Sequence, residues 1–276
     1  MIHHTAIIEE GAEIAEGVIV EPYAVIKKNV KLKKGVVIHA HAYIDGHTTI
    51  GENTVIYPSA AIGLKTQARK FAGETTYVTI GKNCEIREFV TINASYDEGS
   101  TVSIGDNCLI MAYCHIAHHC KLGNHIIMAN SAMLAGHVTI EDYAIIGGMT
   151  PVHQFSRIGC YSMVGGFSRA SHDIPPYTLG SGIPYRLGGL NIIGLKRNNF
   201  SVESRRALTK AFLLTYRRGL TLPEAIKRIE EEVPADPHVE HWLNFCKTTK
   251  RGIIGLEGVT RMRPEDLEED KELLEV

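Results

Sequence analysis

One six-residue unit recurs along the first part of the chain: Ile50-Gly51-Glu52-Asn53, Ile80-Gly81-Lys82-Asn83, Ile104-Gly105-Asp106-Asn107 and Leu122-Gly123-Asn124-His125. Around these copies, every sixth residue from Ile2 to Val164 is aliphatic at 25 of 28 positions, and the exceptions are Ala68, Glu74 and Glu98. Neither the 3.6-residue period of a helix nor the two-residue period of a strand produces this spacing. The repeat therefore predicts an all-β solenoid, a parallel β-helix, in which each unit lays down one short strand.

Position within the unit predicts where each side chain points. The first residue is a branched aliphatic and the fifth is small, so we expect both to point inward. Three units close one triangular coil of eighteen residues, and successive coils stack roughly 4.8 Å apart. Four cysteines occupy the inward fifth position: Cys84, Cys108, Cys114 and Cys120. We expect them to be buried packing groups, not disulfides or metal ligands, which fits a reducing cytoplasm.

Two stretches, 64–77 and 93–100, lack the pattern but leave its phase intact. We interpret each as a loop that projects from the coil, because loops on a rigid scaffold often carry function. The β-helix is predicted to span 1–178, and a Gly/Pro-rich connector to span 179–199.

Capping signals then predict a small α-helical domain over 200–251. Ser201 can cap the first helix, Thr221 and Glu224 form a capping box for the second, and Asp236-Pro237 begins the third. The acidic remainder, 252–276, is expected to be a mobile tail.

Composition excludes several classes of protein. With 276 residues and 44% hydrophobic composition, the chain is long enough for one large domain and one small domain. The net charge of −2 gives no indication of nucleic-acid binding. No apolar run reaches the roughly 18 residues of a membrane span, and we expect neither a signal peptide nor stable membrane insertion.

Histidines on one face of the coil form the main candidate site. The units that begin at Ile116, Leu134 and Val152 are eighteen residues apart and should stack. Their third positions hold His118, Gly136 and Gln154, and their outward phase leaves two chemical interpretations. A metal site would need three or four converging ligands, and the sequence offers no paired cysteine or clear carboxylate partner. An acid/base site needs one imidazole near its ordinary pKa, with an unobstructed glycine amide nearby for an oxyanion.

Several segments together resemble one family. They are Cys114–Cys120, Leu134–Val138, Ile145–Phe155, Val164–Gly166, Pro175–Tyr177 and Asn191–Arg197. The sequence closely resembles the UDP-N-acetylglucosamine O-acyltransferases that start lipid A synthesis, over residues 1 to about 258. The resemblance implies a left-handed β-helix, a cytoplasmic homotrimer with active sites between subunits, and no cofactor. It implies acyl transfer from acyl carrier protein to the 3-hydroxyl of UDP-N-acetylglucosamine.

The resemblance also assigns roles to individual residues. His118 would be the general base, and the Gly136 amide would stabilise the oxyanion. Substrate-binding residues would be Gln67, Lys70, His115, His137, His153, Gln154, Gly166, Asn191 and Arg197, with Gly166 at the end of the acyl pocket. The basic helical domain would suit the acidic carrier protein.

Four residues depart from the family pattern. His119 stands where the family usually has Asp or Asn beside the base, so what orients His118 is open. Ala68 replaces an acidic residue, which leaves a plain or a 3-hydroxylated acyl chain possible. Ile193 and Asn198 replace positions that are often Glu and Arg, which alters the nucleotide contacts.

Three other functions remain as alternatives. A hexapeptide zinc carbonic anhydrase would use the histidines as metal ligands. The N-acyltransferase of the same pathway carries an additional domain before its repeats, whereas the repeats here begin at Ile2. A non-enzymatic trimeric scaffold would share the fold alone.

Overall fold

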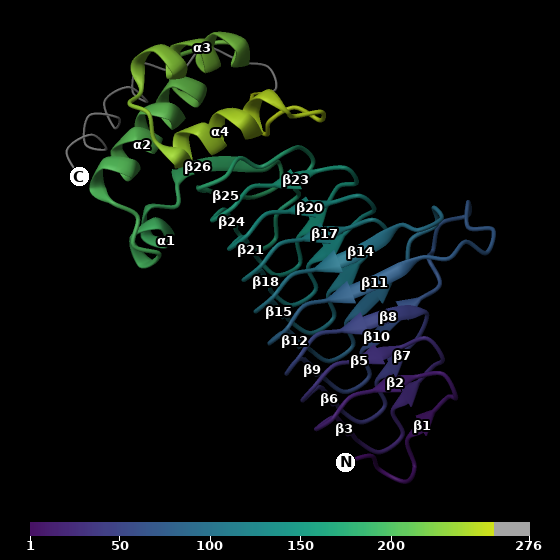
Figure 1. The fold of residues 1–276 in the computed structure, drawn as a ribbon. Helices are drawn as coiled ribbons and strands as arrows, with labels where there is room; N and C mark the ends of the chain where they lie inside the picture. Colours follow the sequence, from purple (N-terminus) through teal and green to yellow (C-terminus); the bar gives the residue numbers. More distant parts are fainter. Residues whose placement is uncertain (257–276) are drawn as a thin grey trace.

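The computed structural model describes residues 1–256 and shows a long triangular coil with a helical domain at its C-terminal end (Figure 1). The strands form three sheets, one on each face of the coil, and within the coil every strand pairs in parallel with the strand one coil away. The chain passes the first, second and third faces in turn.

The strands of the three faces have the following bounds. The first face contains β1 (Ile7–Ile8), β4 (Val25–Ile26), β7 (Tyr43–Ile44), β10 (Ala61–Leu64), β13 (Thr91–Asn93), β16 (His115–Ile116), β19 (Met133–Leu134) and β22 (Pro151–Val152). The second contains β2 (Glu13–Ile14), β5 (Lys31–Leu32), β8 (His47–Ile50), β11 (Tyr77–Ile80), β14 (Thr101–Ile104), β17 (Lys121–Leu122), β20 (Thr139–Ile140) and β23 (Arg157–Ile158). The third contains β3 (Ile19–Val20), β6 (Val37–Ile38), β9 (Val55–Ile56), β12 (Glu85–Ile86), β15 (Leu109–Ile110), β18 (Ile127–Met128), β21 (Ile145–Ile146), β24 (Met163–Val164), β25 (Thr178–Ser181) and β26 (Arg186–Leu190).

The inward phases of the repeat are confirmed. First-position aliphatics such as Ile92, Ile116 and Leu134 are fully buried on the axis of the coil. The four cysteines at the fifth position are buried as free thiols. Burial raises the pKa of the Cys114 thiol to about 11, so this group stays protonated and serves as packing.

Corners of the coil explain the polar part of the unit. The fourth residue adopts a left-handed backbone, with φ of 54° at Asn83 and 59° at His119. Asn and His are enriched among the residues that tolerate this conformation. The second position is often glycine because the coils are close: a Cβ on Gly81 would lie 2.5 Å from the carbonyl oxygen of Gly105 in the next coil.

Both interruptions are loops, and both leave the coil at the same corner. Ile62 pairs with Ile92, and Ile92 pairs with Ile116, so residues 65–76 and 94–100 each follow a strand of the first face. They project to one side of the coil beside β11 and β14 (Figure 1).

The segment expected to be a connector is mostly regular structure. β25 pairs in parallel with β24, β26 returns antiparallel to β25, and helix α1 (Ile192–Arg197) follows. This hairpin extends the third face and occupies the edge that β24 would otherwise leave open, which is why a Gly-rich sequence forms strands here.

The predicted helical domain contains α2 (Val202–Tyr216), α3 (Leu222–Glu232) and α4 (Pro237–Lys247). Ser201, Thr221 and Asp236 are the N-caps of these helices, as the capping signals predict. Trp242 lies at the centre of the domain core. His241 Nε2 lies 2.7 Å from Glu141 Oε2 of the coil, which fixes the helices to the β-helix.

The expectation of a mobile tail from residue 252 is wrong for its first five residues. Ile253 and Ile254 are buried, and the Ile254 N–H donates to the carbonyl oxygen of Asp173 at 2.9 Å. The aliphatic pair therefore packs where an acidic tail was expected. The remainder, 257–276, lies outside the described residues. Within the described part of the chain, no helix has the length and apolar character to cross a bilayer.

Candidate active site

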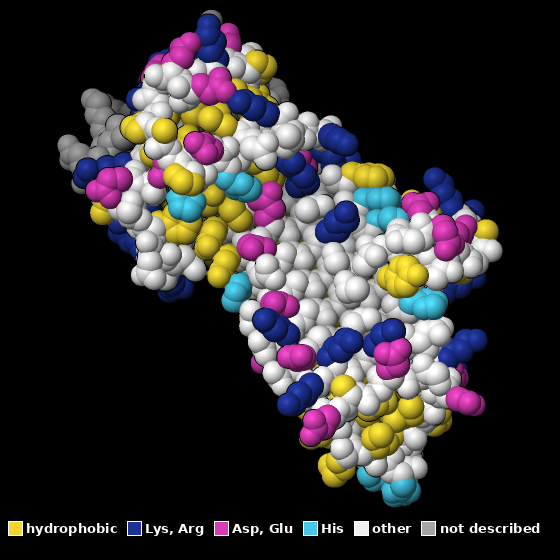
Figure 2. All heavy atoms as spheres, in the orientation of Figure 1, with side chains coloured by type: hydrophobic (Ala, Val, Ile, Leu, Met, Phe, Trp, Pro, Cys, Tyr) yellow, Lys and Arg dark blue, Asp and Glu magenta, His cyan; other side chains and the backbone are white. Residues whose placement is uncertain are grey.

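Stacking of the coils brings His118, Gly136 and Gln154 into one column, as their shared phase predicts. Ile116 pairs with Leu134, and Leu134 pairs with Val152, so the turns that follow these strands lie one above the other. We call the corner formed by residues 117–120, 135–138 and 153–156 the histidine corner. Histidine side chains lie at the base of the projecting loops on the side shown in Figure 2.

Gly136 lies directly against the His118 imidazole. A Cβ at position 136 would lie 2.1 Å from His118 Cε1 and 2.6 Å from Nε2. Any side chain here would therefore displace the ring. Among the described residues, the Gly136 N–H donates to no backbone or side-chain acceptor, so it is free to bind an oxygen atom of a ligand.

Three imidazoles meet at this corner. His118 Nδ1 lies 3.0 Å from His119 Nδ1, a hydrogen-bonding distance. The His119 and His137 rings stack with centroids 4.3 Å apart, and Phe155 continues the stack at 4.5 Å from His137. The left-handed turns at His119 and His137 recur eighteen residues apart, so the rings stack in consecutive coils.

The loop 94–100 adds two residues that the sequence did not reveal. The Tyr96 hydroxyl lies 3.1 Å from His137 Nε2, and its ring packs edge-on against His118 with centroids 4.9 Å apart. Asp97 Oδ2 lies 2.9 Å from His119 Nε2, although the angle is poorer than in a well-formed hydrogen bond. The sequence does indicate that this loop follows Ile92, one coil before the unit that contains His118.

The loop 65–76 supplies the predicted cation. Lys70 Nζ lies 5.9 Å from the Tyr96 ring centroid, so the two loops meet over the histidine corner. Gln67 is exposed in the same loop. Asn93 Nδ2 donates to the carbonyl oxygen of Lys65 at 2.7 Å, which joins the bases of the two loops.

Burial and neighbouring imidazoles lower the pKa of two histidines at this corner. Desolvation, followed by His119 and His137, lowers the pKa of His118, and Asp97 partly opposes this change. Desolvation likewise lowers the pKa of His137. A neutral imidazole is the form that accepts a proton, so these shifts favour a base at His118.

The other predicted residues of this corner lie around the cluster. His115, half-buried on the first face, places Nδ1 2.7 Å from Thr91 Oγ1. His153 and Gln154 are exposed one coil beyond Gly136, and His153 Nδ1 contacts the Gln154 carbonyl oxygen at 3.1 Å. Both are therefore open to a ligand held at the corner.

Three predicted residues lie elsewhere in this chain. Asn191 caps α1, and its Nδ2 donates to the Tyr161 carbonyl oxygen at 2.9 Å, so its amide already has structural partners. Tyr161 lies at the corner between the second and third faces, and Arg197 is exposed at the end of α1, the helix that Asn191 caps. Gly166 lies at the corner between the third and first faces. A Cβ added at this position would lie 3.3 Å from the Gly148 carbonyl oxygen. One chain therefore does not unite all the predicted site residues.

The three imidazoles also form a possible metal-ligand set. One nitrogen from each of His118, His119 and His137 lies within 4.8 Å of the others. In the structure these nitrogens already face one another or Tyr96, as a hydrogen-bonded cluster does.

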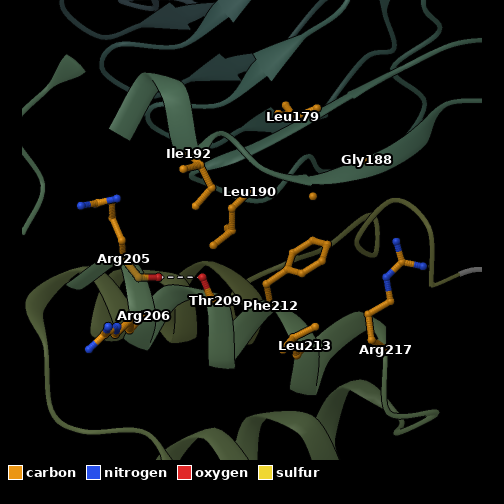
Figure 3. Close-up of a pocket in the computed structure, with 11 residues that line it drawn as sticks. Leu179, Gly188, Leu190, Ile192, Arg205, Arg206, Thr209, Phe212, Leu213 and Arg217 are labelled. Carbon is orange, nitrogen blue, oxygen red and sulfur yellow. Dashed lines mark hydrogen bonds between the residues drawn. The ribbon is translucent and has the colours of Figure 1, made fainter. Parts of the chain in front are cut away.

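A separate apolar hollow lies between β26 and α2 (Figure 3). It has a volume of about 310 Å³, and Leu190, Phe212 and Leu213 line it. Arg205 and Arg217 also line it, from α2 and its C-terminal end. It is distinct from the histidine corner, and it combines apolar walls with positive charge.

Comparison with known proteins identifies the family. The model of the second domain of UDP-N-acetylglucosamine O-acyltransferase matches residues 173–254, and the bacterial transferase hexapeptide model matches 101–136. The acyl-[acyl-carrier-protein]--UDP-N-acetylglucosamine O-acyltransferase of Chlamydia caviae is 52% identical over 275 residues, 99% of each chain. The chain belongs to the UDP-N-acetylglucosamine O-acyltransferase family. It is an acyltransferase, and the resemblance found in the sequence is confirmed.

Other members agree in sequence and fold. The Chlamydia trachomatis enzyme of the same name is 55% identical over 253 residues, 91% of this chain and 90% of its own. The UDP-N-acetylglucosamine acyltransferase of Bacteroides fragilis superposes with a TM-score of 0.90 at 40% identity, covering 92% of this chain and all of the other. The Arabidopsis enzyme gives 0.79 at 35% identity, covering 92% of this chain and 99% of its own. The left-handed β-helix with a C-terminal helical domain is thus confirmed.

The contact between Gly136 and His118 generates a prediction. If His118 is a general base, Gly136→Ala should lower turnover by about 10²-fold or more, because the methyl group would displace the His118 imidazole. The fold should survive, since Gly136 has no positive φ. Steady-state kinetics with circular dichroism would test this. If the effect acts through His118, the double variant Gly136→Ala/His118→Ala should be no slower than His118→Ala alone, whereas multiplied losses would contradict the explanation.

Proposed function

We propose that this enzyme transfers a fatty acyl group from acyl carrier protein to the 3-hydroxyl of UDP-N-acetylglucosamine, the first step of lipid A biosynthesis. The observation that carries the proposal is the His118 imidazole lying against the bare backbone of Gly136. The donor and acceptor classes come from the names of its relatives. We expect the reaction in the cytoplasm, in keeping with six free cysteines.

In this mechanism His118 is the general base. His118 Nε2 removes the proton of the sugar hydroxyl while the hydroxyl oxygen attacks the thioester carbonyl carbon. The carbonyl oxygen becomes negative in the tetrahedral intermediate and accepts a hydrogen bond from the Gly136 N–H. Collapse re-forms the carbonyl and breaks the carbon–sulfur bond, and the departing thiolate takes the proton from His118.

Substrate binding would use the residues around this pair. Lys70 is an exposed cation above the corner and suits a phosphate or sugar oxygen. His137, His115, His153, Gln154 and Gln67 offer neutral donors and acceptors on the same side. Ala68 has no side-chain group that could bond an acyl 3-hydroxyl, so the donor can be a 3-hydroxylated or a plain acyl chain.

The outward side chains favour a homotrimer. Outward residues of the third face include Leu109, Ile127 and Ile145, whereas those of the second face include Lys121 and Arg157. The corner between the third and first faces, which we call the apolar corner, presents residues that are between 49% and 65% exposed: Tyr23, Phe89, Tyr113, Met149 and Phe167. Such an apolar ridge marks an interface, and closed rotational symmetry would bury it at the axis.

This arrangement would complete the active site. If three apolar corners meet at the axis, the first face of one subunit lies against the third face of the next. The histidine corner of one subunit then adjoins the corner of its neighbour that carries Asn191 and Arg197. Gly166, at the apolar corner, would lie inside the interface, where an acyl chain can be shielded from water.

The carrier protein would dock on the helical domain. Between Asn191 and Arg251 the chain has twelve Lys and Arg against seven Asp and Glu. Arg205, Arg206 and Arg217 lie around the apolar hollow of Figure 3. An acidic partner with an apolar prosthetic arm would find both complementary charge and an apolar surface there.

A zinc carbonic anhydrase is the second candidate, because the three imidazoles are grouped as metal ligands are. Metal analysis of the purified protein separates the two functions. About one zinc ion per subunit, with carbon dioxide hydration and without acyl transfer, would favour the alternative.

Transfer assays test the proposal directly. We expect product with UDP-N-acetylglucosamine and at least one member of a panel of plain and 3-hydroxylated acyl carrier proteins of several chain lengths. His118→Ala should lower turnover by about 10²-fold or more, because the base is lost, without unfolding the protein. His4→Ala, an exposed histidine at the N-terminus, is the control. No transfer with any donor would refute the function, and full turnover by His118→Ala would refute the base.

The pH dependence should follow the lowered pKa of His118. A protonated base is inactive, so kcat/KM should fall as the pH falls through that pKa. Because desolvation and the neighbouring imidazoles lower it, the acidic limb should lie below the ordinary histidine value of about 6.5. A limb at or above that value in the pH profile would contradict the described environment of the ring.

The shared site predicts complementation between inactive subunits. His118→Ala and Arg197→Ala should each be inactive or weakly active alone. When the two are unfolded and refolded together in equal amounts, about one site in four would have both residues intact, and activity should return to about a quarter of the wild-type value. Sedimentation would confirm the trimer. If each subunit uses its own two residues, mixing will restore no activity.

A further inference from the structure

The loop 94–100 places a carboxylate at the end of a chain of two imidazoles. Asp97 Oδ2 lies 2.9 Å from His119 Nε2, and His119 Nδ1 lies 3.0 Å from His118 Nδ1. The contact with His118 is a hydrogen bond, whereas the contact with Asp97 is a close electrostatic one without hydrogen-bond alignment. The inference drawn from this chain rests on the proposed function, because it concerns the orientation of the proposed base.

The two Nδ1 atoms allow only two neutral arrangements of protons. In one, His118 Nδ1–H donates to His119 Nδ1, so His118 Nε2 carries a lone pair and His119 carries its proton on Nε2. In the other, His119 Nδ1–H donates, so His118 Nε2 is protonated and cannot act as a base.

The carboxylate distinguishes between these arrangements. In the first, the positive end of the His119 Nε2–H bond lies close to the negatively charged Asp97 oxygen, which is favourable even though the pair is not aligned as a hydrogen bond. In the second, the electron-rich, unprotonated nitrogen lies 2.9 Å from that oxygen, which is repulsive. Asp97 therefore favours the arrangement in which His118 Nε2 is free to accept a proton.

We propose that Asp97 is a positioning residue that acts through His119 to keep His118 in the tautomer required for general-base catalysis. His119, which departs from the family pattern, thereby becomes the link between the base and its carboxylate. When His118 takes the proton of the sugar hydroxyl, its Nδ1–H bond to His119 and the nearby negative charge stabilise the imidazolium until the thiolate removes that proton.

The loop is held firmly enough for this role. The backbone N–H of His119 donates to Ser95 Oγ at 2.9 Å. Ser95 is fully buried and lies two residues before Asp97 in the chain. On the other side, the Gly99 N–H donates to the Thr75 carbonyl oxygen at 2.8 Å. Both ends of the short segment that carries Asp97 are thus anchored to ordered structure.

The surrounding groups do not replace Asp97. His137 and Tyr96 bond to each other, and Lys70 is a cation near the same loops. Among the described residues, Asp97 is the only acidic side chain within ion-pair distance of His119. Its carboxylate is 65% exposed, so water weakens its field and a moderate effect on turnover is expected.

Asp97→Ala tests the proposal. We expect kcat to fall about tenfold while KM for UDP-N-acetylglucosamine stays unchanged. This loss is a small part of the roughly 10²–10⁴-fold rate enhancement that a general base contributes. Asp97 raises the pKa of His118, so its loss should also move the acidic limb of the pH profile to lower pH. Glu98→Gln is the matched control, because it removes one charge from the same loop and keeps an acceptor for the Thr75 N–H. Wild-type turnover by Asp97→Ala would overturn the proposal, as would an equal loss in Glu98→Gln.

A carboxylate placed directly beside His118 distinguishes loss of imidazole orientation from damage to the loop. In the double variant Asp97→Ala/His119→Asp, the new carboxylate can accept directly from His118 Nδ1–H, and Asp tolerates the left-handed backbone at this position. We expect turnover several-fold above that of Asp97→Ala. No recovery would contradict the proposed relay.

Nitrogen-15 spectroscopy of histidine-labelled protein gives a test without turnover. The His118 signals, assigned with His118→Ala, should show a proton on Nδ1 in the wild type and a mixture of tautomers in Asp97→Ala. If the tautomer of His118 in Asp97→Ala is the same as in the wild type, the proposed role of Asp97 is wrong even if acyl transfer is observed. If the wild type transfers no acyl group, the proposed function fails, while the tautomer measurement still decides what Asp97 does.

Discussion

The hydrogen-bond register between successive coils is the constraint on which the rest of the structure depends. Each coil can stack on the next only with its inward aliphatic residues aligned, as Ile116, Leu134 and Val152 are. The register extends into the turns, where the His137 N–H donates to the His118 carbonyl oxygen at 3.0 Å. The His118 imidazole and the Gly136 amide, placed in adjacent turns, therefore keep their separation without further support. This preorganisation is what electrostatic stabilisation of a transition state requires.

Much of the fold follows from the repeat because inward positions have one physical requirement each. The burial of Cys108 and the column of His118 and Gly136 could both be predicted by counting in sixes. Tyr96 and Asp97 could not, because a loop has no period and its side chains are placed by contacts with other segments. The β25–β26 hairpin was missed for a related reason: its strands are dictated by the open edge of β24, and its Gly-rich sequence gives no strand signal.

The outward side chains differ in polarity from one face of the coil to another, and the six-residue period alone does not reveal this difference. Each sixth-position side chain points outward, but only the eighteen-residue coil assigns it to a face, and the two loops change that count by multiples of six. Once the strand pairing is known, the outward side chains of the second face are polar or charged, and those of the other two faces are largely apolar. Asn191 then lies at a different corner from His118, and the proposed trimer would bring the two corners together across a subunit interface.

The histidine cluster imposes two opposing demands on its base. Desolvation and two adjacent imidazoles lower the pKa of His118, which keeps the ring neutral but also weakens it as a proton acceptor. A carboxylate in direct contact would raise the pKa and leave an ion pair at the corner. A carboxylate that acts through His119, as we propose for Asp97, would have a smaller effect: it would select the tautomer and stabilise the imidazolium while the resting ring stays neutral. Such an arrangement would let a site with His119 in place of an acidic or amide side chain retain an oriented base.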